Sequence, residues 1–179
     1  MQRNALDDLK LFSQARGASL SGLPGYAYDS KAGVGITVYI LDTGLDQDHP
    51  VSITDRQWPI MLTAFQEFRN IRLEGRIRWL FLPGEPDGPE NETDDTGHGT
   101  CVASKVVGRK FGVAKSVNIV IVKIHPIDGR IRTSRAIAAL GTVAGDIARQ
   151  DLQGRSVVCI ASGGEQSRVL KCWKFGINV

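Results

Sequence analysis

The sequence lacks long hydrophobic runs. No apolar stretch in its 179 residues approaches the roughly 18–20 residues that a membrane-spanning helix needs, so the sequence predicts no membrane partner. The first 14 residues, MQRNALDDLKLFSQ, also lack the apolar core that a signal peptide requires. We therefore expect either an intracellular protein or one whose leader is absent from this chain.

Cysteine is scarce, and positive charge is not clustered. The three cysteines, Cys101, Cys159 and Cys172, are too few for a disulfide framework and are not spaced like zinc ligands. The formal net charge is +3, and no run of Lys and Arg is longer than two residues. This pattern gives little support for a nucleic-acid partner. We expect no metal, no cofactor and at least one thiol that is unpaired within the chain.

Dense apolar runs alternate with amphipathic ones along the chain. The runs rich in β-branched residues predict strands at 36–41, 117–124 and 156–161, the first of them buried on both faces. The amphipathic runs predict helices at 5–13, 98–107 and about 134–150. Residues 167–179 resemble a helix followed by the start of a fourth strand.

The helix expected at 134–150 has a defined buried face. Thr133 or Ser134 is expected to cap it, and four apolar residues recur at helical spacing: Ile137, Leu140, Ala144 and Ile147. Alternation of strands and helices predicts a three-layer α/β fold, with a mostly parallel sheet and helices on both faces. Residues 17–33 and 85–95 are predicted to be loops, the second an acidic surface loop.

Two short motifs carry candidate chemistry. Asp42 directly follows the first strand in YILDTG, at the carboxyl end where functional residues of such sheets lie. An acid in this place is partly desolvated and stays ionised only when hydrogen-bond donors or positive charge face it. The ring N–H of a histidine is a suitable donor.

The second motif, DDTGHGT, places His98 between two glycines in the first turn of a predicted helix. The positive helix terminus disfavours the imidazolium form, whereas a nearby carboxylate favours it and fixes the tautomer. A neutral, oriented ring of this kind is a general base. Each motif alone also fits a simple turn or a tight helix entry, but their joint presence and order favour two members of a nucleophilic triad.

Three segments together resemble one known family. They are GVGITVYILDTGLDQDHP (33–50), DDTGHGTCVASKVVGRKFGVAKSVNIVIVKI (94–124) and SVVCIASGG (156–164). The chain resembles the subtilisin-like serine peptidases, or subtilases, and most of all their secreted fungal members. The resemblance implies a serine endopeptidase that acts on polypeptides, and it implies secretion.

Carried over residue by residue, the resemblance makes Asp42 the triad acid and His98 the general base. It places Ala161, Ser162 and Gly163 on the segment whose backbone pairs with substrate as an added strand. The opposite rim falls on 129–132, where Arg130, Ile131 and Arg132 stand in place of the family's small residues. The resemblance also implies a single peptidase domain over 1–179, with an N-terminal helix and loop at 1–32 and an insertion at 51–93.

The third triad member has no counterpart in the sequence. Nothing in 1–179 resembles the family's Gly-Thr-Ser-Met-Ala motif or its oxyanion-hole asparagine, so the chain is expected to be a C-terminally truncated and inactive peptidase domain. Cys101 could serve as a nucleophile, but a buried helix thiol is the simpler interpretation. The alternative functions are an inactive truncated product or a peptide-binding pseudoenzyme. A dinucleotide-binding fold is excluded because Gly33 and Gly35 precede the first strand instead of following it.

Overall fold

The computed structural model describes residues 1–15, 17, 19, 22, 24–47, 68, 75–125 and 131–161. The helices and strands in these ranges follow one another in the order α1 (Asp7–Phe12), β1 (Thr37–Asp42), β2 (Ile77–Leu80), η3 (Pro89–Asn91), α3 (His98–Val107), β3 (Asn118–Lys123), α4 (Thr133–Arg149) and β4 (Ser156–Ile160). The helix and strand expected at 167–179 lie outside the described residues. No helix in the described part is long and apolar enough to cross a bilayer.

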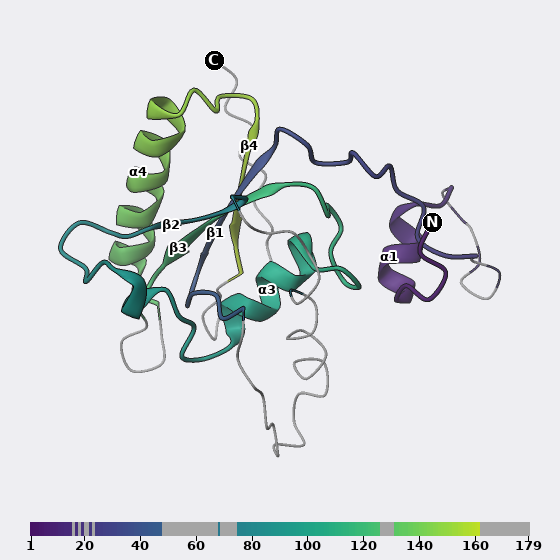
Figure 1. The fold of residues 1–179 in the computed structure, drawn as a ribbon, viewed down its shortest axis with the longest axis horizontal. Coiled ribbons are helices and arrows are strands. Elements are labelled where there is room, and N and C mark those ends of the chain that lie inside the picture. The colour runs from purple at the N-terminus through teal and green to yellow at the C-terminus, as the bar shows by residue number, and fades with distance from the viewer. Residues whose placement is uncertain are drawn as a thin grey trace.

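The sheet is parallel, and β1 lies inside it. Its four strands have the order β2-β3-β1-β4. Thr37 of β1 pairs with Asn118 of β3 on one side and with Ser156 of β4 on the other, so the three strands run in register and end at the same edge. Figure 1 shows α4 on one face of the sheet and α3 on the other. The predicted three-layer arrangement is therefore confirmed.

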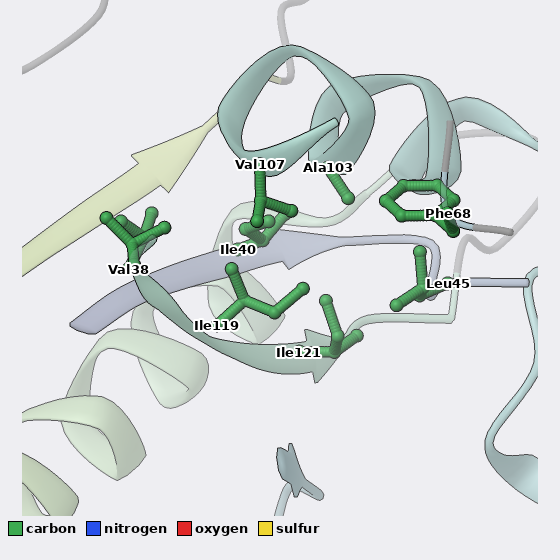
Figure 2. Close-up of a cluster of buried hydrophobic side chains, with 9 residues drawn as sticks. Val38, Ile40, Leu45, Phe68, Ala103, Val107, Ile119 and Ile121 are labelled. Carbon is green, nitrogen blue, oxygen red and sulfur yellow. The ribbon is translucent and has the colours of Figure 1, made fainter. Parts of the chain in front are cut away.

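Alternate residues of β1 serve the two hydrophobic layers. Val38 and Ile40 belong to a cluster with Ala103 and Val107 of α3 and with Ile119 of β3 (Figure 2). Tyr39 and Leu41 point to the other face and pack with residues of β3 and α4. All six residues of β1 are buried. The prediction of a strand buried on both faces is correct, since each face is covered by a helix.

The predicted face and cap of α4 are wrong in part. Leu140 and Ile147 pack against the sheet, but Ile137 is 64% exposed and Ala144 is exposed as well. The buried stripe includes Asp146, whose carboxylate accepts a 2.7 Å hydrogen bond from the hydroxyl of Tyr39 and pairs with Arg78. A search for apolar residues at helical spacing does not identify Asp146 as buried, because its burial depends on its partners Tyr39 and Arg78 on the sheet. The helix begins after Arg132, and no side chain caps it.

Part of the segment 51–93 belongs to the sheet. Residues Ile77–Leu80 form the edge strand β2, which pairs in parallel with β3. The sequence analysis did not identify this strand, because it is short and half-buried and carries an arginine between its apolar residues. Of the same segment, 51–67 and 69–74 lie outside the described residues. The interpretation of 51–93 as an insertion stays a prediction.

The N-terminal helix is present as predicted and is attached to the loop after α3. Tyr26 donates a 2.7 Å hydrogen bond to the carbonyl of Val113, and Gln2 donates one of 2.8 Å to the carbonyl of Lys110. These bonds hold the N-terminal segment against the loop that leads from α3 into β3. They lie away from the carboxyl edge of the sheet.

Candidate active site

Asp42 and His98 meet at the carboxyl edge of the sheet. Asp42 is the last residue of β1, and His98 is the first residue of α3. Their side chains are joined by a contact of 2.7 Å between Nδ1 of the ring and Oδ1 of the carboxylate. The structure thus brings together the two residues that the sequence singled out, while their catalytic roles stay a prediction.

The two partners differ sharply in exposure. The Asp42 side chain is 1% exposed, whereas the His98 side chain is 56% exposed. Oδ1 of Asp42 also accepts a 2.8 Å hydrogen bond from the backbone N–H of Thr43. An ionised carboxylate only accepts, so the ring must carry its proton on Nδ1. The second ring nitrogen, Nε2, is then the basic one, and the exposure of the ring leaves it open to a reactant.

The carboxylate decides the protonation of His98. The hydrogen bond from the ring to Asp42 raises the pKa of His98, and this effect outweighs the lowering caused by partial burial. The charges of Asp42 and Asp94 raise the pKa further. The hydrogen bond to the carboxylate is therefore the largest influence on the pKa of the ring. The imidazolium that forms when the ring takes up a proton is stabilised in place.

Two glycines let the chain segments approach this closely. A Cβ atom at Gly99, the second residue of α3, would lie 2.3 Å from the carbonyl oxygen of Gly44. At Gly44, φ is +128° and a Cβ atom would lie 2.0 Å from the carbonyl oxygen of Thr93. A side chain at Gly99 would push the start of α3 away from the turn after β1, and one at Gly44 would push that turn away from the loop at Thr93 and Asp94.

Asp94 was missed as a residue of the site. The sequence placed it in an exposed acidic loop, but it is 4% exposed. Burial raises its pKa, yet hydrogen bonds from Thr100, Thr43 and Thr96 outweigh burial, so the net pKa is below the ordinary value. The available signal was an acid four residues before His98, where its side chain can accept hydrogen bonds from the free backbone N–H groups of a helix start.

Lys123 holds the same loop from the other side. It is the last residue of β3 and pairs in register with Asp42. Its side chain is 3% exposed, and its ammonium group donates to the carbonyl of Asn91 at 3.3 Å and to the hydroxyl of Thr93 at 3.1 Å. The loop that carries the histidine motif is therefore bound to the end of a central strand.

Two other candidates for chemistry have weaker positions. Cys101 lies in α3, and burial raises the pKa of its thiol, with Lys105 opposing and two carboxylates adding to the effect. A raised pKa disfavours the thiolate, which is the nucleophilic form. His125 follows β3 by two residues, outside the two sequence motifs that carry Asp42 and His98, and its Nδ1 lies 3.1 Å from Oε2 of Glu85.

The predicted substrate-binding segment is described only at its start. Ala161 directly follows β4 and is half-buried, whereas Ser162 and Gly163 lie outside the described residues. On the opposite rim, Ile131 and Arg132 are described and Ile131 packs against the cluster under α4. In the part of the chain that the structure describes, no three His, Cys, Asp or Glu residues gather in a way that could hold a metal ion.

Comparisons with known proteins agree with this architecture. The subtilase family model matches residues 33–174. The subtilisin-like serine protease Pen ch 13 of Penicillium rubens is 34% identical over 150 residues, which are 84% of this chain and 31% of that protein. Subtilisin-like protease 3 of Pseudogymnoascus destructans is 32% identical over 154 residues, which are 85% of this chain and 32% of that protein. The chain thus spans about a third of the length of these curated relatives.

A solved structure shares the fold. The crystal structure of a cold adapted subtilisin-like serine proteinase superposes with a TM-score of 0.62 and 30% identity, covering 92% of this chain and 48% of the other. The family model matches most of the sequence, and the parallel sheet covered on both faces agrees with that match. The chain belongs to the subtilase family.

Proposed function

We propose that this chain carries the acid and the base of a serine endopeptidase that hydrolyses polypeptides. The observation that carries the proposal is the 2.7 Å contact between His98 and the buried carboxylate of Asp42. It supplies an oriented ring with an open Nε2 and a raised pKa. These are the properties that a general base of acyl transfer needs.

In the proposed reaction, His98 takes the proton of a serine hydroxyl as the hydroxyl oxygen attacks the peptide carbonyl. It then gives that proton to the leaving amine. Asp42 accepts the Nδ1 proton in a hydrogen bond, fixes the tautomer and stabilises the imidazolium without becoming protonated. No stretch of 1–179 resembles the family's serine motif. Because loss of the serine in subtilisin lowers turnover by about 10⁶, we propose that residues 1–179 alone do not cleave peptides.

The proposed substrate is an extended polypeptide that pairs with the backbone at 161–163. Support comes from Ala161, which follows the register pair Leu41↔Ile160 of β1 and β4. The end of β4 therefore lies at the same edge as Asp42. An added strand binds through main-chain hydrogen bonds, which suits a peptidase that accepts many sequences. The similarity to fungal proteases also leads us to propose secretion.

A fusion protein tests the catalytic proposal by gain of activity. The segment of this chain that matches Pen ch 13 would replace the corresponding segment of that protease, and cleavage of a fluorogenic peptide would be measured. We expect activity that falls by about 10⁶ with His98→Ala and by about 3 × 10⁴ with Asp42→Ala, the sizes measured in subtilisin. A folded but inactive fusion, or one whose activity survives His98→Ala, would contradict the proposal.

A second candidate is peptide binding without cleavage, and the position of Ala161 after β4, at the same edge of the sheet as Asp42, supports it. Isothermal titration of the 1–179 polypeptide with an extended peptide library measures it directly. Binding that is unchanged by His98→Ala, combined with an inactive fusion, would support this candidate. Cleavage by the 1–179 polypeptide that disappears in His98→Ala would exclude it.

A further inference from the structure

The turn after β1 and the start of α3 exchange hydrogen bonds through two threonine hydroxyls. The hydroxyl of Thr43, in the turn, accepts a 3.0 Å hydrogen bond from the backbone N–H of Gly99 in the helix. The hydroxyl of Thr100, in the helix, accepts a 3.0 Å hydrogen bond from the backbone N–H of Asp46 in the turn. Each segment thus accepts a backbone donor of the other.

Both hydroxyls donate to one carboxylate. Thr43 donates to Oδ1 of Asp94 at 2.7 Å, and Thr100 donates to Oδ2 at 2.6 Å. The Thr43 hydroxyl also lies 3.3 Å from Oδ1 of Asp42, but a hydroxyl has one proton, and the shorter contact to Asp94 takes it. The lone pairs of both hydroxyls then face the backbone donors. All three side chains are buried, with exposed fractions of 9%, 0% and 4% for Thr43, Thr100 and Asp94. In this setting an unpaired polar group is costly, so the set acts as a unit.

The carboxylate also binds the backbone that leads into the helix. Oδ1 of Asp94 accepts from the N–H of Gly97 at 3.0 Å and from that of Thr96 at 3.2 Å, and Oδ2 accepts from the N–H of Thr100 at 2.8 Å. These are backbone donors on both sides of His98. Asp94 therefore contacts the segment of the base directly and the segment of the acid through Thr43.

We propose that the Asp94 carboxylate, acting through the two threonine hydroxyls, holds the turn after β1 and the start of α3 at the separation that keeps Asp42 and His98 in contact. Asp94 is then a positioning residue, and Thr43 and Thr100 are its two connections. The inference rests on the proposed roles of Asp42 and His98, but it concerns the geometry of the pair and needs no peptidase activity to be tested.

Asp94 also acts on His98 through its charge, which raises the pKa of the ring. Replacing Asp94 would therefore mix a loss of charge with a loss of position. Thr43→Val separates the two effects. It removes the hydroxyl at nearly constant volume and leaves the charges of both carboxylates in place. Thr43→Ser, which keeps the hydroxyl, is the matching rescue variant.

The experiment is an NMR titration of His98 in the 1–179 polypeptide. It reads the ring pKa and the low-field resonance of the hydrogen-bonded Nδ1–H. We expect Thr43→Val to lower the pKa part of the way to its value in Asp42→Asn and to weaken or abolish the Nδ1–H resonance. Thr43→Ser should restore both signals. Glu92→Gln, which neutralises an exposed acid of the same loop, should change neither.

The outcomes distinguish the inference from the proposed function. If Asp42→Asn leaves the His98 pKa unchanged, the acid–base pair itself is wrong. If Asp42→Asn lowers the pKa but a folded Thr43→Val does not, the positioning role of Asp94 and the two threonines is wrong. Should Thr43→Val fail to fold, Thr96→Val decides the question. Thr96 is an exposed residue whose hydroxyl lies 2.8 Å from that of Thr43, and removal of this hydroxyl should give a smaller shift in the same direction. An unchanged pKa there would overturn the inference.

Discussion

Replacing Gly99 by alanine adds one methyl group where α3 approaches the turn after β1 most closely. The new Cβ atom would lie 2.3 Å from the carbonyl oxygen of Gly44 and 3.2 Å from Cβ of Asp42. Ordinary contacts between such atoms are about 3.5 Å, so the first turn of α3 must move by about 1 Å. His98 precedes the new methyl group directly and must move with it.

The expected losses follow from that displacement. A 1 Å shift, roughly, stretches the 2.7 Å contact between Nδ1 of His98 and Oδ1 of Asp42 beyond the limit of about 3.5 Å for a hydrogen bond. Overpacking of this kind costs about 1–3 kcal/mol. For a chain of this length each kcal/mol lowers the melting temperature by about 2–4 °C. Gly99→Ala should therefore lower the melting temperature by several degrees and lower the pKa of His98.

The same substitution at Gly141 is the matched control. Gly141 lies in the middle of α4, and a Cβ atom there would meet nothing within 4 Å. Alanine is favoured over glycine in a helix by about 1 kcal/mol, so Gly141→Ala should raise the melting temperature and leave His98 unchanged. A Gly99→Ala variant with the melting temperature of the wild type and an unchanged pKa of His98 would refute the close packing of α3 on the turn after β1.

Three further predictions concern stability. Ile121→Ala, at a fully buried position of β3, should lower the free energy of unfolding by about 2–5 kcal/mol in urea titrations, whereas Val157→Ala at a half-exposed position should change it by less than about 0.5 kcal/mol. Arg78→Met should lower the free energy of unfolding by about 1–3 kcal/mol, less than for a fully buried pair because the Arg78 side chain is 41% exposed. The double variant Arg78→Met with Asp146→Leu should recover most of this loss in thermal melts. Because the folded-state pKa of His98 is raised above 6.5, its stabilising pairing is fully present below that pH and is lost as the pH rises through the folded-state pKa. The wild type should exceed His98→Asn in stability most at acid pH; an excess that grows toward alkaline pH would contradict the assigned sign.

Much of the fold could be predicted because its signals are local. The buried strand that ends at Asp42 is dense in β-branched and aromatic residues, and the helix that begins at His98 follows a glycine. Both signals lie within a few residues of the functional group. In a parallel sheet the strands end, and the helices that follow them begin, at the same edge, so Asp42 at the end of β1 and His98 at the start of α3 were expected at that edge.

Other features depend on partners that are distant in sequence. β2 is short and half-buried, and it becomes a strand by pairing with β3. The buried stripe of α4 contains Asp146, which is stable there only because Tyr39 and Arg78 reach it from the sheet. Local periodicity cannot show that an acid will find such partners.

The sequence by itself determined the family, the layers of the fold and the two residues, Asp42 and His98, that meet at the edge of the sheet, because each is encoded in a continuous stretch with its own pattern. Only the tertiary structure decided that Asp94 is buried between the two motifs and how the pair is held. Its role depends on hydroxyls at Thr43 and Thr100, which are 51 and 6 residues away along the chain. The local sequence would be the same whether Asp94 were exposed in an acidic loop or buried between the two threonines. Only the packing of α3 against the turn after β1 distinguishes the two cases.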